Sequence, residues 1–174
     1  SASKASCEIL AASFRNSYCQ NGQSASHLKI ATARAGNVIG GGDWSKLRIV
    51  PDIVRAYSNN QLLKIRNRNS IRPWQHVLEP LWGYKKLAEK LFISNNNSEY
   101  ESAFNFGPKT ENNKNVEELV NELLLHWPGK SSINPNKNTK EPESKMLNLN
   151  SDKSFNLLSW SQNWDFPETI KKTI

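Results

Sequence analysis

The most informative segment of the sequence reads Arg34-Ala35-Gly36-Asn37-Val38-Ile39-Gly40-Gly41-Gly42-Asp43-Trp44. The alternating run at residues 28–34 predicts a strand leading into it, because Leu28, Ile30 and Thr32 would share one face. Four glycines in seven positions indicate a backbone that bends sharply or closely approaches another group. Ligands of α/β proteins bind at the carboxyl ends of strands, so the segment is a candidate binding loop. A surface loop built from turn residues is the alternative.

The length and charge of the chain limit the classes of protein and of ligand that the sequence could represent. The chain has 174 residues, 37% of them hydrophobic, which suffices for one buried core. The net charge of +7 suits phosphate-bearing small molecules. It does not favour nucleic acid, because no stretch gathers five or six basic residues together. No apolar run approaches membrane-spanning length, so we expect no membrane partner.

Cysteine and histidine give no sign of a metal site. Cys7 and Cys19 lack zinc or redox spacing and predict free thiols in a reducing compartment, hence a cytoplasmic location. His27, His76 and His126 lack the spacing of metal ligands, and we expect His76 to be structural.

Helical and strand patterns alternate along the chain. The patterns predict helices at residues 3–19, 52–58, 79–92, 116–126 and 151–158 and from Pro167 onward, and strands at 28–34, 62–66, 103–106 and around Met146 to Leu149. Residues 127–142 are polar and predict a loop. This order favours an α/β fold with an irregular lobe.

Several short motifs now occur in a fixed order: Ser1-Ala2-Ser3-Lys4, Arg34-Ala35-Gly36-Asn37-Val38-Ile39-Gly40, Arg48-Ile49-Val50-Pro51, Ile71-Arg72-Pro73-Trp74-Gln75-His76-Val77 and Asn105-Phe106-Gly107-Pro108. Together they resemble the extended branch of the short-chain dehydrogenase/reductase superfamily. The first resembles the end of its Tyr-x-x-x-Lys signature, and the second its Arg-x-x-Asn-x-x-Gly loop. In detail, Gly40 to Trp44 and Arg72 to His76 resemble the CDP-glucose 4,6-dehydratase family.

The resemblance implies only part of that fold. Residues 1–174 would form the C-terminal, sugar-nucleotide-binding portion, namely the edge of a Rossmann-type parallel sheet with a small α/β substrate-binding lobe. The chain would start just after the catalytic Tyr, and the N-terminal half with its GxxGxxG loop would be missing. The strands at residues 28–34 and 103–106 should then be parallel neighbours. The first helix should lack its packing partner and leave Ile9, Leu10 and Phe14 partly bare.

The resemblance also implies an activity. The parent would be an NAD-dependent lyase that converts CDP-glucose to CDP-4-keto-6-deoxyglucose, in deoxysugar, O-antigen and lipopolysaccharide biosynthesis. The family oxidises C4 of the hexose with NAD, removes water across C5–C6 and returns the hydride to C6. The parent would be a homodimer, by analogy with the family. The fragment alone would be inactive, and a stand-alone, non-catalytic sugar-nucleotide-binding or interaction module is the alternative.

Two residues are expected near the cofactor. Lys4 would lower the pKa of the Tyr that acts as base and would hydrogen-bond the nicotinamide ribose. The alternative for Lys4 is a solvated side chain near a helix start. Val38 would lie near the nicotinamide mainly through its backbone, with simple core packing as the alternative.

Other residues are expected around the sugar nucleotide. Arg72 would pair with the diphosphate, because a guanidinium matches phosphate oxygens, and a surface Arg on a turn is the alternative. Asn37 would bind the phosphate or sugar side, or serve only as a turn residue. Asn105 would contact the nucleotide side or cap a strand end. Arg48, Ile49 and Pro51 would line the nucleotide pocket, and the alternative is that they only form a helix entry. Glu143 would supply a further polar contact to the substrate.

Overall fold

A computed structural model describes residues 2–19, 28–94, 99–127, 133–134 and 144–174. The chain divides into two compact units. The first comprises residues 1–35, 80–106 and 150–161, and the second comprises 36–79, 107–149 and 162–174. Within the described residues, no helix has the length and apolar character needed to cross a membrane.

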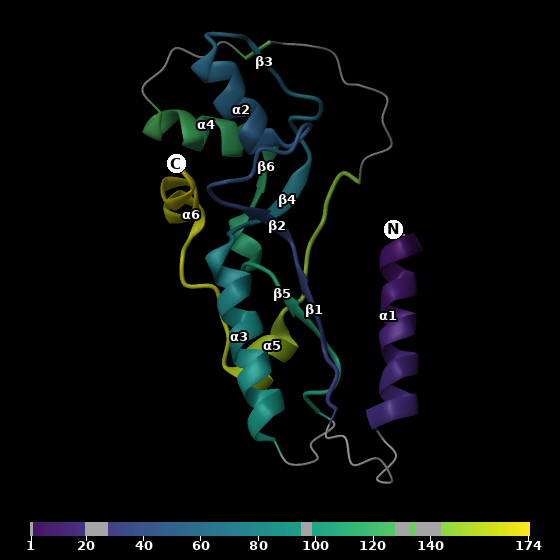
Figure 1. Ribbon diagram of the computed structural model, residues 1–174. Coiled ribbons are helices and arrows are strands. Elements are labelled where there is room, and N and C mark those ends of the chain that lie inside the picture. Colours follow the sequence, from purple (N-terminus) through teal and green to yellow (C-terminus); the bar gives the residue numbers. More distant parts are fainter. Residues whose placement is uncertain (1, 20–27, 95–98, 128–132, 135–143) are drawn as a thin grey trace. The chain divides into compact units, whose positions relative to one another are not determined.

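The first unit is built on a parallel pair of strands, β1 (Thr32–Ala35) and β5 (Ala103–Phe106) (Figure 1). Thr32 lies opposite Ala103, and the register continues to Ala35 and Phe106. The expected parallel pairing is therefore confirmed. The strand before the glycine segment is shorter than predicted: β1 begins at Thr32, and residues 28–31 are not part of a strand.

Helices α3 (Leu78–Ile93) and α5 (Asp152–Leu158) complete the core of this unit with the buried side chains of Leu87 and Leu158. Phe104 and Phe106 are fully buried, and Trp160 stands edge-on to Phe106 with ring centroids 5.1 Å apart. Gly83 allows this contact, since a Cβ there would lie 2.2 Å from the Phe106 ring. One lysine binds the end of α3: Lys29 Nζ donates to the carbonyls of Leu91 and Ser94.

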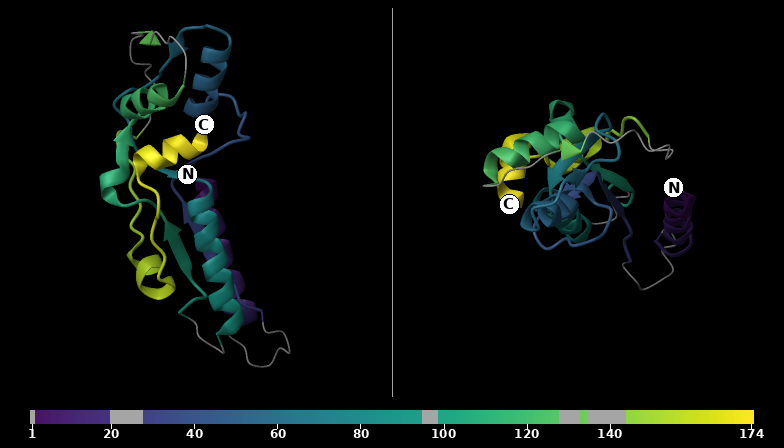
Figure 2. Two further views of the ribbon diagram at one scale, coloured as in Figure 1. Left: turned by 90° about the vertical axis from the view of Figure 1, so that its left-hand side faces the viewer. Right: turned by 90° about the horizontal axis from the view of Figure 1, so that it is seen from above.

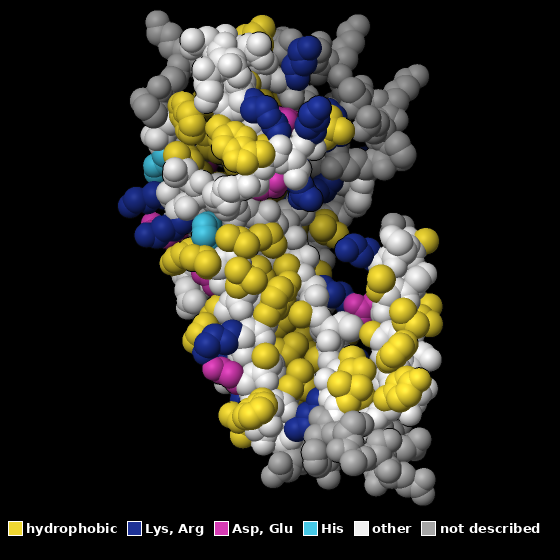
Figure 3. Space-filling view, viewed as in Figure 1, with side chains coloured by type: hydrophobic (Ala, Val, Ile, Leu, Met, Phe, Trp, Pro, Cys, Tyr) yellow, Lys and Arg dark blue, Asp and Glu magenta, His cyan; other side chains and the backbone are white. Residues whose placement is uncertain are grey.

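The first helix, α1 (Ala2–Phe14), continues as a π-helical turn at Arg15–Cys19. None of its residues is buried. Ile9, Leu10 and Phe14 are 72%, 59% and 47% exposed, which confirms the prediction that they are partly bare. Figure 3 shows hydrophobic side chains gathered on the surface of this helix.

The second unit contains a three-stranded sheet in the order β2 (Asn37–Ile39), β4 (Ile71–His76) and β6 (Asn113–Asn115). β4 is parallel to β2 and antiparallel to β6. Sequence patterns predicted neither β2 nor β4 nor β6. Pro73 and three polar residues make β4 unlike a typical strand sequence, yet Pro73 to His76 are all buried in the centre of the sheet.

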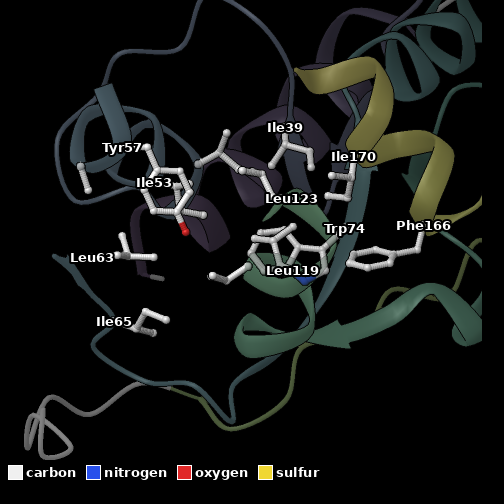
Figure 4. Close-up of a cluster of buried hydrophobic side chains, with 13 residues drawn as sticks. Ile39, Ile53, Tyr57, Leu63, Ile65, Trp74, Leu119, Leu123, Phe166 and Ile170 are labelled. Carbon is white, nitrogen blue, oxygen red and sulfur yellow. The ribbon is translucent and has the colours of Figure 1, made fainter. Parts of the chain in front are cut away.

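Three helices cover the core of the second unit: α2 (Ile49–Ser58), α4 (Val116–His126) and α6 (Phe166–Thr173). α4 and α6 lie side by side (Figure 2). Trp74 of β4 lies among apolar side chains from all three helices (Figure 4), which include Ile53, Leu119, Leu123, Phe166 and Ile170. This cluster gives the second unit a core of its own.

Helix boundaries follow local chemistry. α4 begins with a reciprocal cap, in which the Asn115 side chain accepts from the Glu118 N–H and the Glu118 carboxylate accepts from the Asn115 N–H. Its bounds match the prediction. α2 starts at Ile49, three residues earlier than predicted, because Pro51 needs no hydrogen bond in the first turn.

The remaining strand predictions are corrected in length. β3 is only Leu63–Lys64 and pairs in parallel with β7 (Ile133–Asn134). The region near Met146 forms one parallel bridge to Ile71 rather than a strand. A short 3₁₀ turn, Thr110–Asn112, precedes β6.

Candidate functional site

The carboxyl ends of β2 and β4 meet at one edge of the second unit's sheet. The Val77 N–H donates to the Ile39 carbonyl at 2.8 Å and continues the pairing beyond β4. A Cβ on Gly40 would lie 2.8 Å from Val77 Cγ1, and one on Gly36 would lie 2.8 Å from Pro73 Cγ. These two glycines are therefore needed for close packing of β2 on β4. The glycine segment leaves the sheet at the position where α/β proteins bind ligands.

The loop after Gly40 is exposed but well anchored. Gly42 has a φ of +84° and Leu47 a φ of +64°, so both lie in the left-handed region. Arg55 donates to the carbonyls of Trp44 and Ser45 at 2.7 and 3.1 Å. The Leu47 carbonyl accepts from Arg66 at 2.6 Å. Two arginines thus hold the loop conformation through its backbone.

Asn37 and Arg72 share one face of this sheet. Asn37 lies opposite Trp74, and Arg72 precedes Trp74 by two residues, so side-chain alternation puts all three on the same side. Arg72 is only 7% exposed and lies in a strand. The alternative of a surface arginine on a turn is therefore wrong.

A second cation lies next to Arg72. Lys114 of β6 is its cross-strand partner, and antiparallel partners point to the same face. Lys114 also lies 3.8 Å from Glu118, while its carbonyl accepts from Trp74 Nε1. Two neighbouring cations suit a diphosphate. The sequence patterns missed Lys114 because they predicted no strand at Asn113–Asn115, and no local signal marks this pairing.

Val38 lies on the opposite face, across from Gln75. Successive carbonyls of a strand point to opposite edges, and the Ile39 carbonyl points to β4. The Val38 carbonyl therefore points to the outer edge of β2, where the described part of the chain has no pairing strand. Its backbone polar groups suit a ligand contact, while its side chain is partly buried.

The three residues expected at the nucleotide pocket form a helix entry. Arg48 is the N-cap of α2, and its Nε lies 3.7 Å from the Asp43 carboxylate. Ile49 packs against the unit's core, and Pro51 is buried in the first turn. Of these three, only Arg48 has a mostly exposed side chain. The Ser45 N–H bonds the Asp43 carboxylate and holds the pKa of that carboxyl below its usual range.

His76 has a structural environment, as expected. It is 6% exposed, accepts from the Leu78 N–H at 3.2 Å and contacts the Trp164 ring edge-on. Burial lowers its pKa and favours the neutral ring. Nearby, the buried Glu79 carboxylate accepts from the Asn163 and Trp164 N–H groups.

The other two predicted residues, Lys4 and Asn105, belong to the first unit. Lys4 is exposed in the first turn of α1. Asn105 Oδ1 accepts from Arg34 at 3.3 Å and its Nδ2 donates to the Asn150 carbonyl at 3.0 Å. Both ends of this amide are thus used within the unit, which favours the capping alternative. Glu143 lies outside the described residues. No group of three or more metal-ligating side chains occurs within the described ranges.

The sequence comparison agrees with the order of the motifs. The chain is 40% identical over 173 residues to CDP-glucose 4,6-dehydratase of Salmonella typhimurium strain LT2. This alignment covers 99% of the chain. The chain is a relative of CDP-glucose 4,6-dehydratase. It spans about half the length of that relative, 48%. No protein-family model matches the sequence.

Solved structures with low sequence identity share the fold. A UDP-galactose 4-epimerase matches with a TM-score of 0.75 at 16% identity, covering 99% of this chain and 50% of the epimerase. The dTDP-glucose 4,6-dehydratase of Bacillus anthracis, solved with NAD, matches with a TM-score of 0.70 at 18% identity, covering 99% and 49%. The fold is therefore α/β, as predicted, and corresponds to about half of the fold of these epimerase and dehydratase structures.

Proposed function

We propose that this chain is the C-terminal, sugar-nucleotide-binding portion of an NAD-dependent CDP-glucose 4,6-dehydratase. The observation that carries the proposal is the 40% identity to CDP-glucose 4,6-dehydratase across 99% of the chain. The parent would release CDP-4-keto-6-deoxyglucose for deoxysugar and O-antigen synthesis in the cytoplasm, as a homodimer. The chain alone would be inactive, because it contains no GxxGxxG loop.

The sugar nucleotide would bind along β2 and β4, with its diphosphate near the start of β4. Arg72 and its cross-strand neighbour Lys114 supply two positive charges for the diphosphate. Asn37 lies on the same face and presents an amide that both donates and accepts. Arg48, exposed at the start of α2, adds a cation that reaches a nucleotide from the glycine loop.

The residues of this chain fit one end of NAD. NAD, when bound, would accept a hydride from the sugar and return it. The Val38 carbonyl, which points to the outer edge of β2, suits the nicotinamide end. Lys4 carries a cation on an exposed helical turn, suited to ribose hydroxyls and to holding a neighbouring phenol as its anion. Gly40, Gly41 and Gly42 lack the spacing that cradles a dinucleotide pyrophosphate.

The test restores the missing part. The N-terminal half of the Salmonella relative is joined to Ser1, and CDP-glucose turnover is followed as formation of the 4-keto sugar. We expect turnover by the chimera and none by the 174 residues alone. A folded chimera that binds NAD but leaves CDP-glucose unchanged would refute the proposal, as would turnover by the chain alone.

A stand-alone binding module is the second candidate. The apolar core around Trp74, Leu119 and Leu123 favours it, because the second unit buries a cluster of its own. Calorimetric titration of the 174-residue chain with CDP-glucose separates the two. A module would bind the sugar nucleotide tightly without NAD and without the missing half, whereas the dehydratase portion would bind it only weakly.

A further inference from the structure

One face of α1 makes polar contacts to β1 and the segment before it. Thr32 Oγ1 donates to Glu8 Oε2 at 2.8 Å, and Arg34 Nε donates to Glu8 Oε1 at 2.6 Å. Arg15, two turns further along, donates from Nε to the Ile30 carbonyl at 3.0 Å. Glu8 and Arg15 are seven residues apart and therefore lie on the same face of the helix.

The order of these contacts sets the direction of α1. Arg15 contacts residue 30, and Glu8 contacts residues 32 and 34, so the helix runs opposite to the strand. Lys4 precedes Glu8 by four residues and lies on the same face, about 6 Å further along the axis. The face that carries Lys4 thus continues toward the carboxyl end of β1, where the chain enters the glycine segment.

Apolar packing does not fix this helix within the described residues. No residue of α1 is buried, and its large apolar side chains are exposed (Figure 3). The paired carboxylate of Glu8, together with the Arg15 contact, therefore fixes the rotation and height of α1 on β1, and Glu8 is the contact nearer to Lys4. Arg34 is itself held from the other side by Asn105 Oδ1 at 3.3 Å. Both partners of the ion pair thus have defined positions.

We propose that Glu8 is the positioning residue for Lys4: by binding Thr32 and Arg34 it holds the Lys4 face of α1 toward the carboxyl end of β1. This inference rests on the proposed function, in which Lys4 acts on the neighbouring base. It also gives Arg34 a role, because the motif arginine then orients the helix through Glu8. Asn105 contributes to the same role, because its Oδ1 accepts a hydrogen bond from the Arg34 guanidinium.

The first measurement uses the 174-residue chain itself. Amide hydrogen exchange of residues 2–14 reports how firmly α1 is held. We expect Glu8→Ala to speed exchange in these residues and to leave the second unit unchanged. The matched control is Glu89→Gln, which removes an exposed helical ion pair with Lys85 and should leave exchange in α1 unchanged. Unaltered exchange in α1 of Glu8→Ala would overturn the proposal.

The second measurement uses the chimera described above and tests positioning rather than stability. We expect Glu8→Ala to lower kcat at pH 7 by at least about tenfold, with little change in KM for CDP-glucose. Because a displaced Lys4 no longer lowers the pKa of the base, the pH profile of kcat should move to higher pH. Glu8→Asp should restore part of kcat, since it retains the carboxylate.

The Lys4→Ala variant distinguishes the positioning role of Glu8 from the proposed function of the chain. If Lys4→Ala lowers kcat but Glu8→Ala leaves kcat and its pH profile unchanged, the positioning role is wrong and the proposed function stands. If Lys4→Ala has no effect on an active chimera, the assignment of Lys4 fails, and the role of Glu8 fails with it. If the unaltered chimera is inactive, the proposed function fails, and hydrogen exchange alone decides whether Glu8 anchors α1.

Discussion

Replacement of Arg72 by Ala should weaken binding of CDP-glucose to the chimera and leave NAD binding nearly unchanged. Arg72 is 7% exposed, so its interaction with a diphosphate would be poorly screened by water. Loss of one partner from such a charged, hydrogen-bonded pair costs about 2–3 kcal/mol. This corresponds to a Kd increase of about 30- to 150-fold.

Calorimetric titration with CDP-glucose and, separately, with NAD measures both effects. Arg72→Lys is the companion variant, because it keeps the charge but loses the planar fork, and we expect an intermediate loss. Arg68→Ala is the control, since the Arg68 guanidinium lies 3.6 Å from Glu117. It should change the CDP-glucose Kd less than about twofold. An unchanged Kd for CDP-glucose in a folded Arg72→Ala protein would remove Arg72 from the site.

Three further predictions concern the chain itself. Gly83→Ala should lower the free energy of unfolding by about 1–3 kcal/mol in thermal denaturation, because its Cβ would lie 2.2 Å from Phe106 Cδ1. Gly41→Ala is the control and should cost far less, because Gly41 faces open space; equal effects of the two substitutions would contradict this packing. The hydrogen bond from Arg34 lowers the pKa of Glu8 from 4.5 to about 2. Hydrogen exchange should therefore show α1 held against β1 above pH 4.5 and released as the pH falls toward 2, and release already near pH 6 would refute this role of the Glu8 carboxylate. The N-terminal half of the Salmonella relative, added as a separate chain, should bind this chain and protect α1 from exchange, whereas a chain that stays separate in sedimentation would count against a missing partner.

Local sequence determined much of the secondary structure. The helix at Val116–His126 and the strand at Ala103–Phe106 have the predicted bounds. The reason is local in both cases: α4 has a reciprocal cap and regular apolar spacing, while β5 alternates between half-buried and buried residues and ends at Gly107-Pro108. The order of short motifs also identified the relative correctly, because such spacing is retained along the chain.

Tertiary structure decided the rest. β4 contains a proline and three polar residues, and it becomes a central strand only because β2 and β6 pair with both of its edges. The same pairing buries Arg72 and puts Lys114 opposite it, which no local pattern encodes. Glu8 and Arg34 are 26 residues apart and meet only when α1 lies against β1. Sequence thus supplied the candidate residues and the order of the motifs, while pairing between distant segments decided which of these residues become neighbours.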